Sequence, residues 1–216
     1  PDRGALGGTA AAAYVATIQR ETPDGKRALM ETSLLIPVVL ILALGGFVQG
    51  FSGFGLALVS VPLLSLFLDV RTAVPLAALF GWLVTLPIVW RMAASVRWRV
   101  GLVLVAGALP GSFLGAALLK YLPGGWILLG MGIVLCAASS YSLFGRGVTL
   151  PRSGLPLTLG CGFSAGVIGA SVGEPGPPVV AYMNFQPWSA HEIKATLNFF
   201  FMLQMIFALT AFVLQG

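Results

Sequence analysis

Charged residues are scarce in this chain, and their scarcity excludes an ordinary water-soluble fold. Only 9% of the 216 residues are Asp, Glu, Lys or Arg, whereas 57% are hydrophobic. A typical soluble domain has about 25% charged residues. A soluble protein of this size could not cover so much apolar surface, because its outer layer must contact water. Lipid can solvate such a surface, so the composition predicts an integral membrane protein whose outer partner is the lipid bilayer.

Residues that build catalytic and metal sites are also scarce. The chain has one histidine, His191, and its two cysteines, Cys136 and Cys161, lie in apolar stretches without the spacing of a metal or redox motif. The seven acidic residues lie mostly outside the apolar runs, and no HExxH-like pairing occurs. We therefore expect no metal, no cofactor and no enzymatic activity.

The net charge of +5 does not indicate a nucleic-acid-binding protein. The basic residues stand singly or in small groups between apolar runs, and they form neither a basic stripe nor a known nucleic-acid-binding module. Charges placed in this way are typical of the loops of a membrane protein. We expect no nucleic-acid partner.

Six apolar runs predict helices that cross a bilayer. Each crossing requires about 20 residues. They are residues 34–68, 73–90, 100–119, 126–144, 155–182 and 195–214. These runs predict an all-α, polytopic helical bundle with about six spans in the cell membrane. Residues 1–30 hold most of the polar content and lack the pattern of a signal peptide, so we expect a disordered or surface-lying extension there.

Two of the runs are too long for one straight span. Residues 34–68 would extend about 52 Å as a continuous helix, against a hydrocarbon core of about 30 Å. Glycines interrupt this run at Gly50–Gly55, and Gly169–Pro178 interrupts the run 155–182. We expect broken helices that still cross the membrane. A re-entrant hairpin at the first break is the alternative, but it would move Arg91, Arg97 and Arg99 to the outer side.

The distribution of Lys and Arg predicts a cytoplasmic N-terminus. With six crossings in that orientation, nine of these residues lie in cytoplasmic segments, and only Arg71, Lys120 and Lys194 lie on the other side. Cytoplasmic loops of membrane proteins carry such an excess of basic residues.

The two breaks lie at corresponding positions of an internal repeat. A shift of 116 residues aligns Gly46 with Gly162, Gly50 with Gly166, Gly53 with Gly169, and Pro62 with Pro178. We expect a first repeat of four spans at 31–152 and an incomplete second repeat of two spans at 153–216. Four spans between the two starts would make the repeats parallel, whereas one more or one fewer crossing would invert them. Interrupted helices at matching positions are typical of secondary transporters, which bind substrate there.

The chemistry of the breaks suits an anion. An unwound helix inside a membrane leaves backbone groups that need a polar partner, and the N-terminus of a half-helix attracts negative charge. We expect such ends near Leu56 and Pro178. The candidate binding residues are Gly50, Ser52, Gly53, Gly55, Gly169, Ser171, Gly173, Glu174, Pro177 and Pro178. The glycines could instead serve only close helix packing, the interpretation that we prefer for Gly45, Gly46, Gly107, Gly111 and Gly115.

Glu174 is the one acidic residue within a predicted span, and such residues are functional candidates. It could take up a proton and couple transport to a proton gradient. Alternatively, it lies at a water-exposed mouth of the break or pairs with Lys194. Lys194 in turn could attract an anion or pair with Glu192.

The two broken segments share an order of motifs. The first portion, Gly45–Gly81, reads GGFVQGFSGFGLALVSVPLLSLFLDVRTAVPLAALFG, and the second, Gly162–Phe201, reads GFSAGVIGASVGEPGPPVVAYMNFQPWSAHEIKATLNFFF. A glycine-rich break, then Pro-Pro-Val-Val, then Lys-Ala-Thr-Leu-Asn-Phe-Phe resembles the sulfite exporter family, TauE/SafE. The resemblance implies a membrane transporter of sulfite, organosulfonates or related small anions, commonly with seven or eight spans. Lys194, Thr196 and Asn198 match the family's motif, so we add them to the candidate site.

Together these features predict an exporter of a small anion such as sulfite or an organosulfonate. We expect the two breaks to face each other and to bind one anion, while rocking of the repeats alternates access. An anion channel would use the same helix ends. An accessory membrane subunit is a further alternative, and a homo-oligomer or a longer chain would supply the helices that the second repeat lacks.

Overall fold

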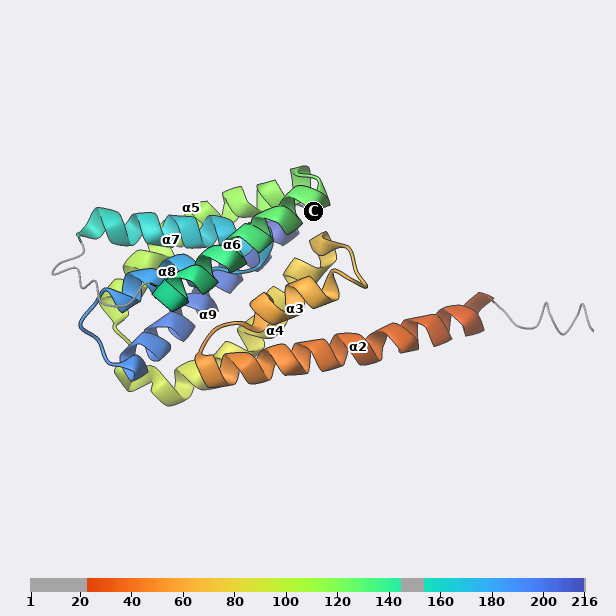
Figure 1. Cartoon of the computed structure of the whole chain (residues 1–216), viewed down its shortest axis with the longest axis horizontal. Helices are drawn as coiled ribbons and strands as arrows, with labels where there is room; N and C mark the ends of the chain where they lie inside the picture. The colour runs from red at the N-terminus through yellow and green to blue at the C-terminus, as the bar shows by residue number, and fades with distance from the viewer. Residues whose placement is uncertain (1–22, 145–153, 216) are drawn as a thin grey trace, which may run out of the picture. The chain divides into compact units, whose positions relative to one another are not determined.

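The computed structural model describes residues 23–144 and 154–215, and within these ranges the chain forms helices and no strand (Figure 1). This agrees with the predicted all-α membrane bundle. The helices are α2 (Pro23–Ser52), α3 (Leu56–Leu64), α4 (Val70–Met92), α5 (Trp98–Tyr121), α6 (Gly124–Phe144), α7 (Leu155–Val172), α8 (Gly176–Asn184) and α9 (Ala190–Gln215), with a short 3₁₀ turn η1 (Ala93–Ser95).

The predicted domain boundaries fall partly outside these ranges. Residues 1–22 of the expected extension and the expected repeat boundary at 152–153 lie outside the described residues, and α2 begins within the expected extension, at Pro23. The chain divides into two compact units at residue 40, and every contact given below lies within the second, Ile41–Gly216.

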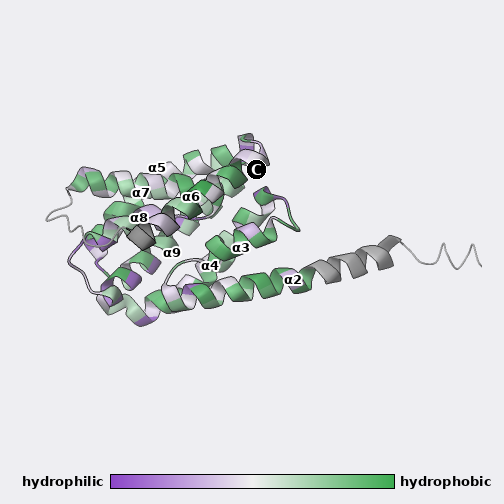
Figure 2. Cartoon of the chain, viewed as in Figure 1, coloured by the Kyte–Doolittle hydropathy of each residue, from purple (hydrophilic) through white to green (hydrophobic). Residues whose placement is uncertain are grey.

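The described helices have the lengths and surfaces of membrane spans. Five of them are long and apolar enough to cross a bilayer, and Gly124–Ala137 is a shorter apolar helix. Figure 2 shows that hydrophobic residues run along most of the described helices. Large apolar side chains face outward, such as Phe47 with 74% of its surface exposed and Trp90 with 86%. Lipid solvates such surfaces, so the fold is that of a multi-pass membrane protein.

The first break reverses the chain. Ser60 of α3 donates a hydrogen bond to the carbonyl oxygen of Ile41 in α2 at 3.3 Å. In one continuous helix these residues would lie about 28 Å apart. A Cβ atom on Gly45 would lie 2.9 Å from the carbonyl oxygen of Leu56, so α3 runs back along α2. The expectation of a broken helix that continues across the membrane was wrong.

Backbone geometry explains the reversal. Gly53 and Gly55 have φ angles of 89° and 111°, in the left-handed region that residues with a Cβ rarely adopt. Two such residues on either side of Phe54 turn the chain between the end of α2 and the start of α3. The number of basic residues on each side of the membrane carries no information about this local geometry.

The second break forms a matching hairpin between α7 and α8. The hydroxyl groups of Thr158 and Tyr182 lie 2.9 Å apart, although the residues are 24 positions apart. A Cβ atom on Gly169 would lie 2.7 Å from Cβ of Pro175. Gly173, with a φ angle of 86°, ends α7. Helix α8 therefore returns along α7, and both expected broken helices fold back as hairpins.

The two hairpins reveal the register of the repeat. Ser52 and Val172 end the first helices, Leu56 and Gly176 begin the half-helices, and Val70 and Ala190 begin the helices that follow. Each pair is 120 residues apart, rather than 116. The glycine matches in the sequence differ from this spacing by four residues. Four residues are about one helical turn, so the matched glycines still lie on the same helix face. Gly53 therefore corresponds to Gly173 rather than to Gly169.

The packing of α4 against α9 favours inverted over parallel repeats. Helices α4 and α9 are equivalent in the two repeats, yet they pack antiparallel. Gly81 of α4 lies against Met205 of α9, whereas Val89 of α4 packs with Ala195 and Phe199. Helices α4, α5 and α6 lie between the two hairpins in the chain. An odd number of crossings between two repeats inverts the second one, an architecture that occurs in secondary transporters.

Glycines bring α5 and α7 into backbone contact. Cβ atoms on Gly107, Gly111 and Gly115 of α5 would overlap carbonyl oxygens of α7, and the same holds for Gly162 and Gly166 against α5. Small residues spaced by four allow such close packing between membrane helices. The packing interpretation of the α5 glycines and of Gly45 is confirmed.

Helix α9 forms the centre of the main core. Its Leu197, Phe200 and Phe201 are buried in one cluster with Val179 and Met183 of α8. This packing holds the N-terminal half of α9 beside the breaks.

Candidate anion-binding site

The tips of the two hairpins meet at Glu174. Its carboxylate accepts hydrogen bonds from the backbone N–H of Leu58, in the first turn of α3, and of Gly176, the first residue of α8. Only 3% of Glu174 is exposed. A Cβ atom on Gly176 would lie 3.4 Å from the Phe54 ring, and one on Gly173 would lie 3.0 Å from Val61. The two breaks therefore contact each other. Glu174 neither lies at a water-exposed mouth nor pairs with Lys194.

A cavity of about 580 Å³ opens beside the hairpin tips. The first break contributes Ser52 and Phe54, and the start of α8 contributes Pro177 and Pro178. Lys194 is the only basic residue among those that line it. The cavity thus brings together residues of both predicted breaks and the predicted lysine of α9.

Lys194 binds the end of α2. Its ammonium donates to the carbonyl oxygens of Gly50 at 2.8 Å and Phe51 at 3.1 Å. The last carbonyls of a helix lack helical partners and carry partial negative charge, so a cation there is stabilising. Lys194 therefore occupies the C-terminal end of α2, and the expected pair with Glu192 does not form.

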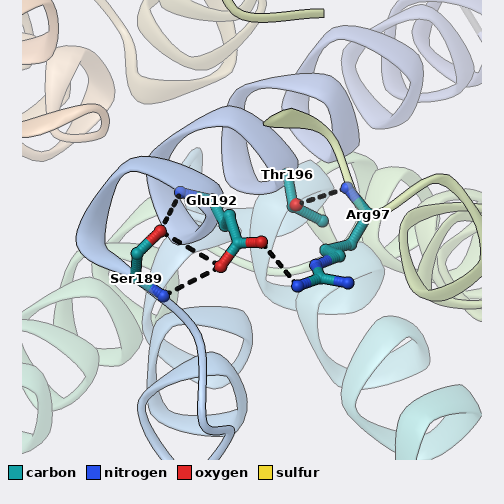
Figure 3. A network of polar contacts seen from close by, with 4 residues as sticks. All are labelled: Arg97, Ser189, Glu192 and Thr196. Atoms are coloured by element: carbon teal, nitrogen blue, oxygen red, sulfur yellow. Dashed lines mark hydrogen bonds and ion pairs between the residues drawn. The ribbon is translucent and has the colours of Figure 1, made fainter. Parts of the chain in front are cut away.

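Glu192 instead pairs with Arg97, as Figure 3 shows. The two side chains are 2.5 Å apart, and Ser189 donates to the other carboxylate oxygen through both its N–H and its hydroxyl. The Thr196 hydroxyl accepts the backbone N–H of Arg97 at 3.0 Å. Thr196 thus joins α9 to the start of α5, and the structure does not bring it to either break.

Asn198 holds the first break. Its amide nitrogen donates to the carbonyl oxygen of Gly53 at 3.0 Å and to that of Lys194 at 2.8 Å. Its side-chain oxygen is buried and has no hydrogen-bond partner. A Cβ atom on Gly53 would lie 2.8 Å from the Lys194 side chain, so the break fits closely against α9.

The two candidate serines are engaged locally. Ser52 donates to the carbonyl oxygen of Val48 at 2.8 Å and also contacts that of Phe54. Ser171 donates to the carbonyl oxygen of Val167 at 2.7 Å. Ser52 lines the large cavity and Ser171 does not. Within residues 23–144 and 154–215, no three His, Cys, Asp or Glu side chains cluster in a way that could hold a metal ion.

The family model described as Sulfite exporter TauE/SafE matches residues 38–216. The chain belongs to this family. Comparisons with curated proteins and with solved structures found no match. Membership confirms the resemblance seen in the two broken segments, and it makes the chain a member of a family of transporters rather than of a class of enzymes.

In this TauE/SafE protein, the start of α8 offers few N–H groups to an anion. Proline has no backbone N–H, so Pro177 and Pro178 remove two of the first three donors of α8. The remaining donor, Gly176, is bonded to Glu174. The expected half-helix end near Pro178 is present, and its one N–H in these first three positions is already occupied. Gly169 packs against Pro175, the residue before α8, and against the Gln204 amide.

Sequence reasoning missed Gln49. This residue of α2 is 2% exposed, and its amide nitrogen has no hydrogen-bond partner. With Glu174, Gly55 and Gly173 it lines a second, small cavity of about 10 Å³ between the hairpin tips, which has room for about one water molecule. The signal was present, because a polar side chain inside a long apolar run is a functional candidate.

Proposed function

We propose that this TauE/SafE protein exports a small anion, such as sulfite or an organosulfonate, across the cell membrane. The observation that carries the proposal is the cavity of about 580 Å³, lined by both hairpins and by the Lys194 side chain. Transporters with broken helices bind their substrates at these breaks, and a positive side chain beside them favours an anion.

The lining of the cavity supports an anion with an organic part. Val180, Ile193 and Leu197 supply apolar surface, and binding sites for small molecules commonly combine apolar walls with a few polar groups. In this proposal, the ammonium of Lys194 and the hydroxyl of Ser52 bind the oxyanion, while the apolar wall receives the carbon chain of a sulfonate. Gly53 and Gly173 hold the hairpin tips in place through their left-handed conformations.

We propose that the end of the bundle with Arg91, Arg97 and Arg99 faces the cytoplasm, since cytoplasmic loops are rich in basic residues. Arg71 lies at the opposite end, where it donates to the carbonyl oxygens of Leu119 and Leu122. The cytoplasmic N-terminus expected from the sequence depended on a crossing by residues 34–68. Since these residues form a hairpin, that orientation needs its own test.

The purified protein allows a direct test of the binding site. Sulfite and methanesulfonate should each raise the Tm of the wild type in a saturable way, measured against chloride at equal ionic strength. Lys194→Gln should abolish this stabilisation. The matched control Lys120→Gln, at the far end of α5, should retain it. If neither anion stabilises the wild type, the site assignment is wrong.

Flux measurements separate a transporter from a channel. In proteoliposomes, a transporter should show saturable flux of labelled sulfite and counterflow against unlabelled sulfite. A conductance that does not saturate would favour the anion channel, which could use the same cavity.

A further inference from the structure

Hydrogen-bond donors from both repeats converge between the hairpin tips. The N–H of Leu58 belongs to the first turn of α3, and the N–H of Gly176 begins α8. Both half-helices are nine residues long. The amide nitrogen of Gln49, buried and without a partner, lines the same small cavity. A set of donors at two helix N-termini is the arrangement that binds an anion in proteins.

The group that the two backbone donors bind is the chain's own carboxylate, whereas the Gln49 amide nitrogen remains without a partner. Glu174 accepts from both backbone donors and is almost fully buried. Among the described residues, Glu192 pairs with Arg97, whereas no basic side chain pairs with Glu174. An unpaired carboxylate is costly to bury. The first turns of the two half-helices therefore provide its hydrogen bonds.

The small cavity lies next to the large one. Phe54 and Pro177 line the large cavity, whereas Gly55 and Pro175 line the small one. The same two breaks thus form the walls of both cavities.

We propose that the N-termini of α3 and α8, together with Gln49, form a second anion-binding site, and that Glu174 is its tethered resident ligand. A small oxyanion can replace the carboxylate at these donors. Replacement breaks the hydrogen bond by which Glu174 joins the hairpins of the two repeats, so the hairpins become free to move apart. This last step rests on the proposed transport function, whereas the binding site itself does not.

Chemical rescue tests the site without any transport measurement. Glu174→Ala should lower the Tm, and formate or acetate at millimolar concentration should restore much of the loss in a saturable way. The wild type, whose site is filled, should gain nothing beyond the effect of chloride. Glu192→Ala is the matched control, because it removes a more exposed carboxylate that also accepts a hydrogen bond from a backbone N–H. Formate should not restore the Tm of this variant. A Tm of Glu174→Ala that formate and acetate leave unchanged would overturn the proposal.

A second variant covers the case in which Glu174→Ala does not fold. Glu174→Gln keeps the shape and one acceptor but lacks the charge, so it should compete less with a free anion. Formate should then raise the Tm of Glu174→Gln at concentrations about tenfold lower than those at which it affects the wild type. Equal responses of the two proteins would contradict a resident anion. Rescue by formate without stabilisation of the wild type by sulfite would support this site and refute the proposed substrate.

Discussion

The ammonium of Lys194 lies 2.8 Å from the carbonyl oxygen of Gly50, although 144 residues separate them in the chain. This bond joins the last turn of the first hairpin's long helix to the helix that follows the second hairpin. Lys194 therefore has two roles in our account: it stabilises the end of α2, and it supplies the positive charge of the large cavity.

Replacement of Lys194 should separate these roles. Lys194→Met removes the charge and both hydrogen bonds, so it should destabilise the protein by about 1–2 kcal/mol and abolish stabilisation by sulfite. Lys194→Arg keeps a cation, so it should retain part of the stability and part of the stabilisation by sulfite. Thermal unfolding with and without sulfite measures both quantities. If Lys194→Met binds sulfite as the wild type does, Lys194 only stabilises the helix end.

A pair of glycines in α7 tests the close packing against α5. Gly162→Ala would place a Cβ atom on the backbone of Leu104 and should cost about 1–3 kcal/mol of stability. Gly160→Ala, two positions away, meets no atom within 4 Å and should be neutral or stabilising, because alanine favours helix. Equal Tm values for the two variants would show that α5 and α7 do not pack in this way.

A second pair tests the left-handed turn. Gly53→Ala forces a residue with a Cβ into a φ angle of 89° and should cost about 1–2 kcal/mol. Gly50→Ala lies three residues earlier, in the helix, with no atom within 4 Å of its Cβ, and should not destabilise. Thermal unfolding compares them. Tolerance of Gly53→Ala would mean that the chain does not reverse at this residue.

Cross-linking can test the first hairpin directly. In a background without Cys136 and Cys161, cysteines at Ile41 and Ser60 should be joined by a short bifunctional thiol reagent, since Ser60 bonds to the Ile41 carbonyl. A continuous helix would hold the two positions about 28 Å apart. The two single-cysteine variants are the controls, because they can form cross-links only between two protein molecules. Failure of the double variant to cross-link, with both thiols reactive, would restore the crossing helix.

Accessibility of single cysteines should reveal the orientation. In the same background, Arg91→Cys should react with an impermeant maleimide only after the cell membrane is opened, because we place that end in the cytoplasm. Tyr121→Cys, at the exposed far end of α5, should react in intact cells. The reverse pattern would place the cluster of Arg91, Arg97 and Arg99 outside.

The amino-acid sequence alone determined the class of the protein and the positions of its breaks. Apolar runs of known length predict membrane helices because the bilayer thickness is a fixed external constraint. The glycines from Gly50 to Gly55 and from Gly169 to Gly176 predict interruptions because they contradict the helical pattern around them. The candidate residues Lys194 and Asn198 were also found, through motif resemblance, and the structure brings both to the first break.

Only the tertiary structure decided the direction in which the chain continues after each break. Glycine permits a left-handed φ angle without requiring it, so Gly53 and Gly173 are equally compatible with a kinked crossing helix and with a hairpin. The packing of Ser60 on Ile41 and of Tyr182 on Thr158 selects the hairpin. That choice brings Glu174 to the N–H groups of Leu58 and Gly176. A contact between residues more than a hundred positions apart depends on this packing, and no local pattern encodes it.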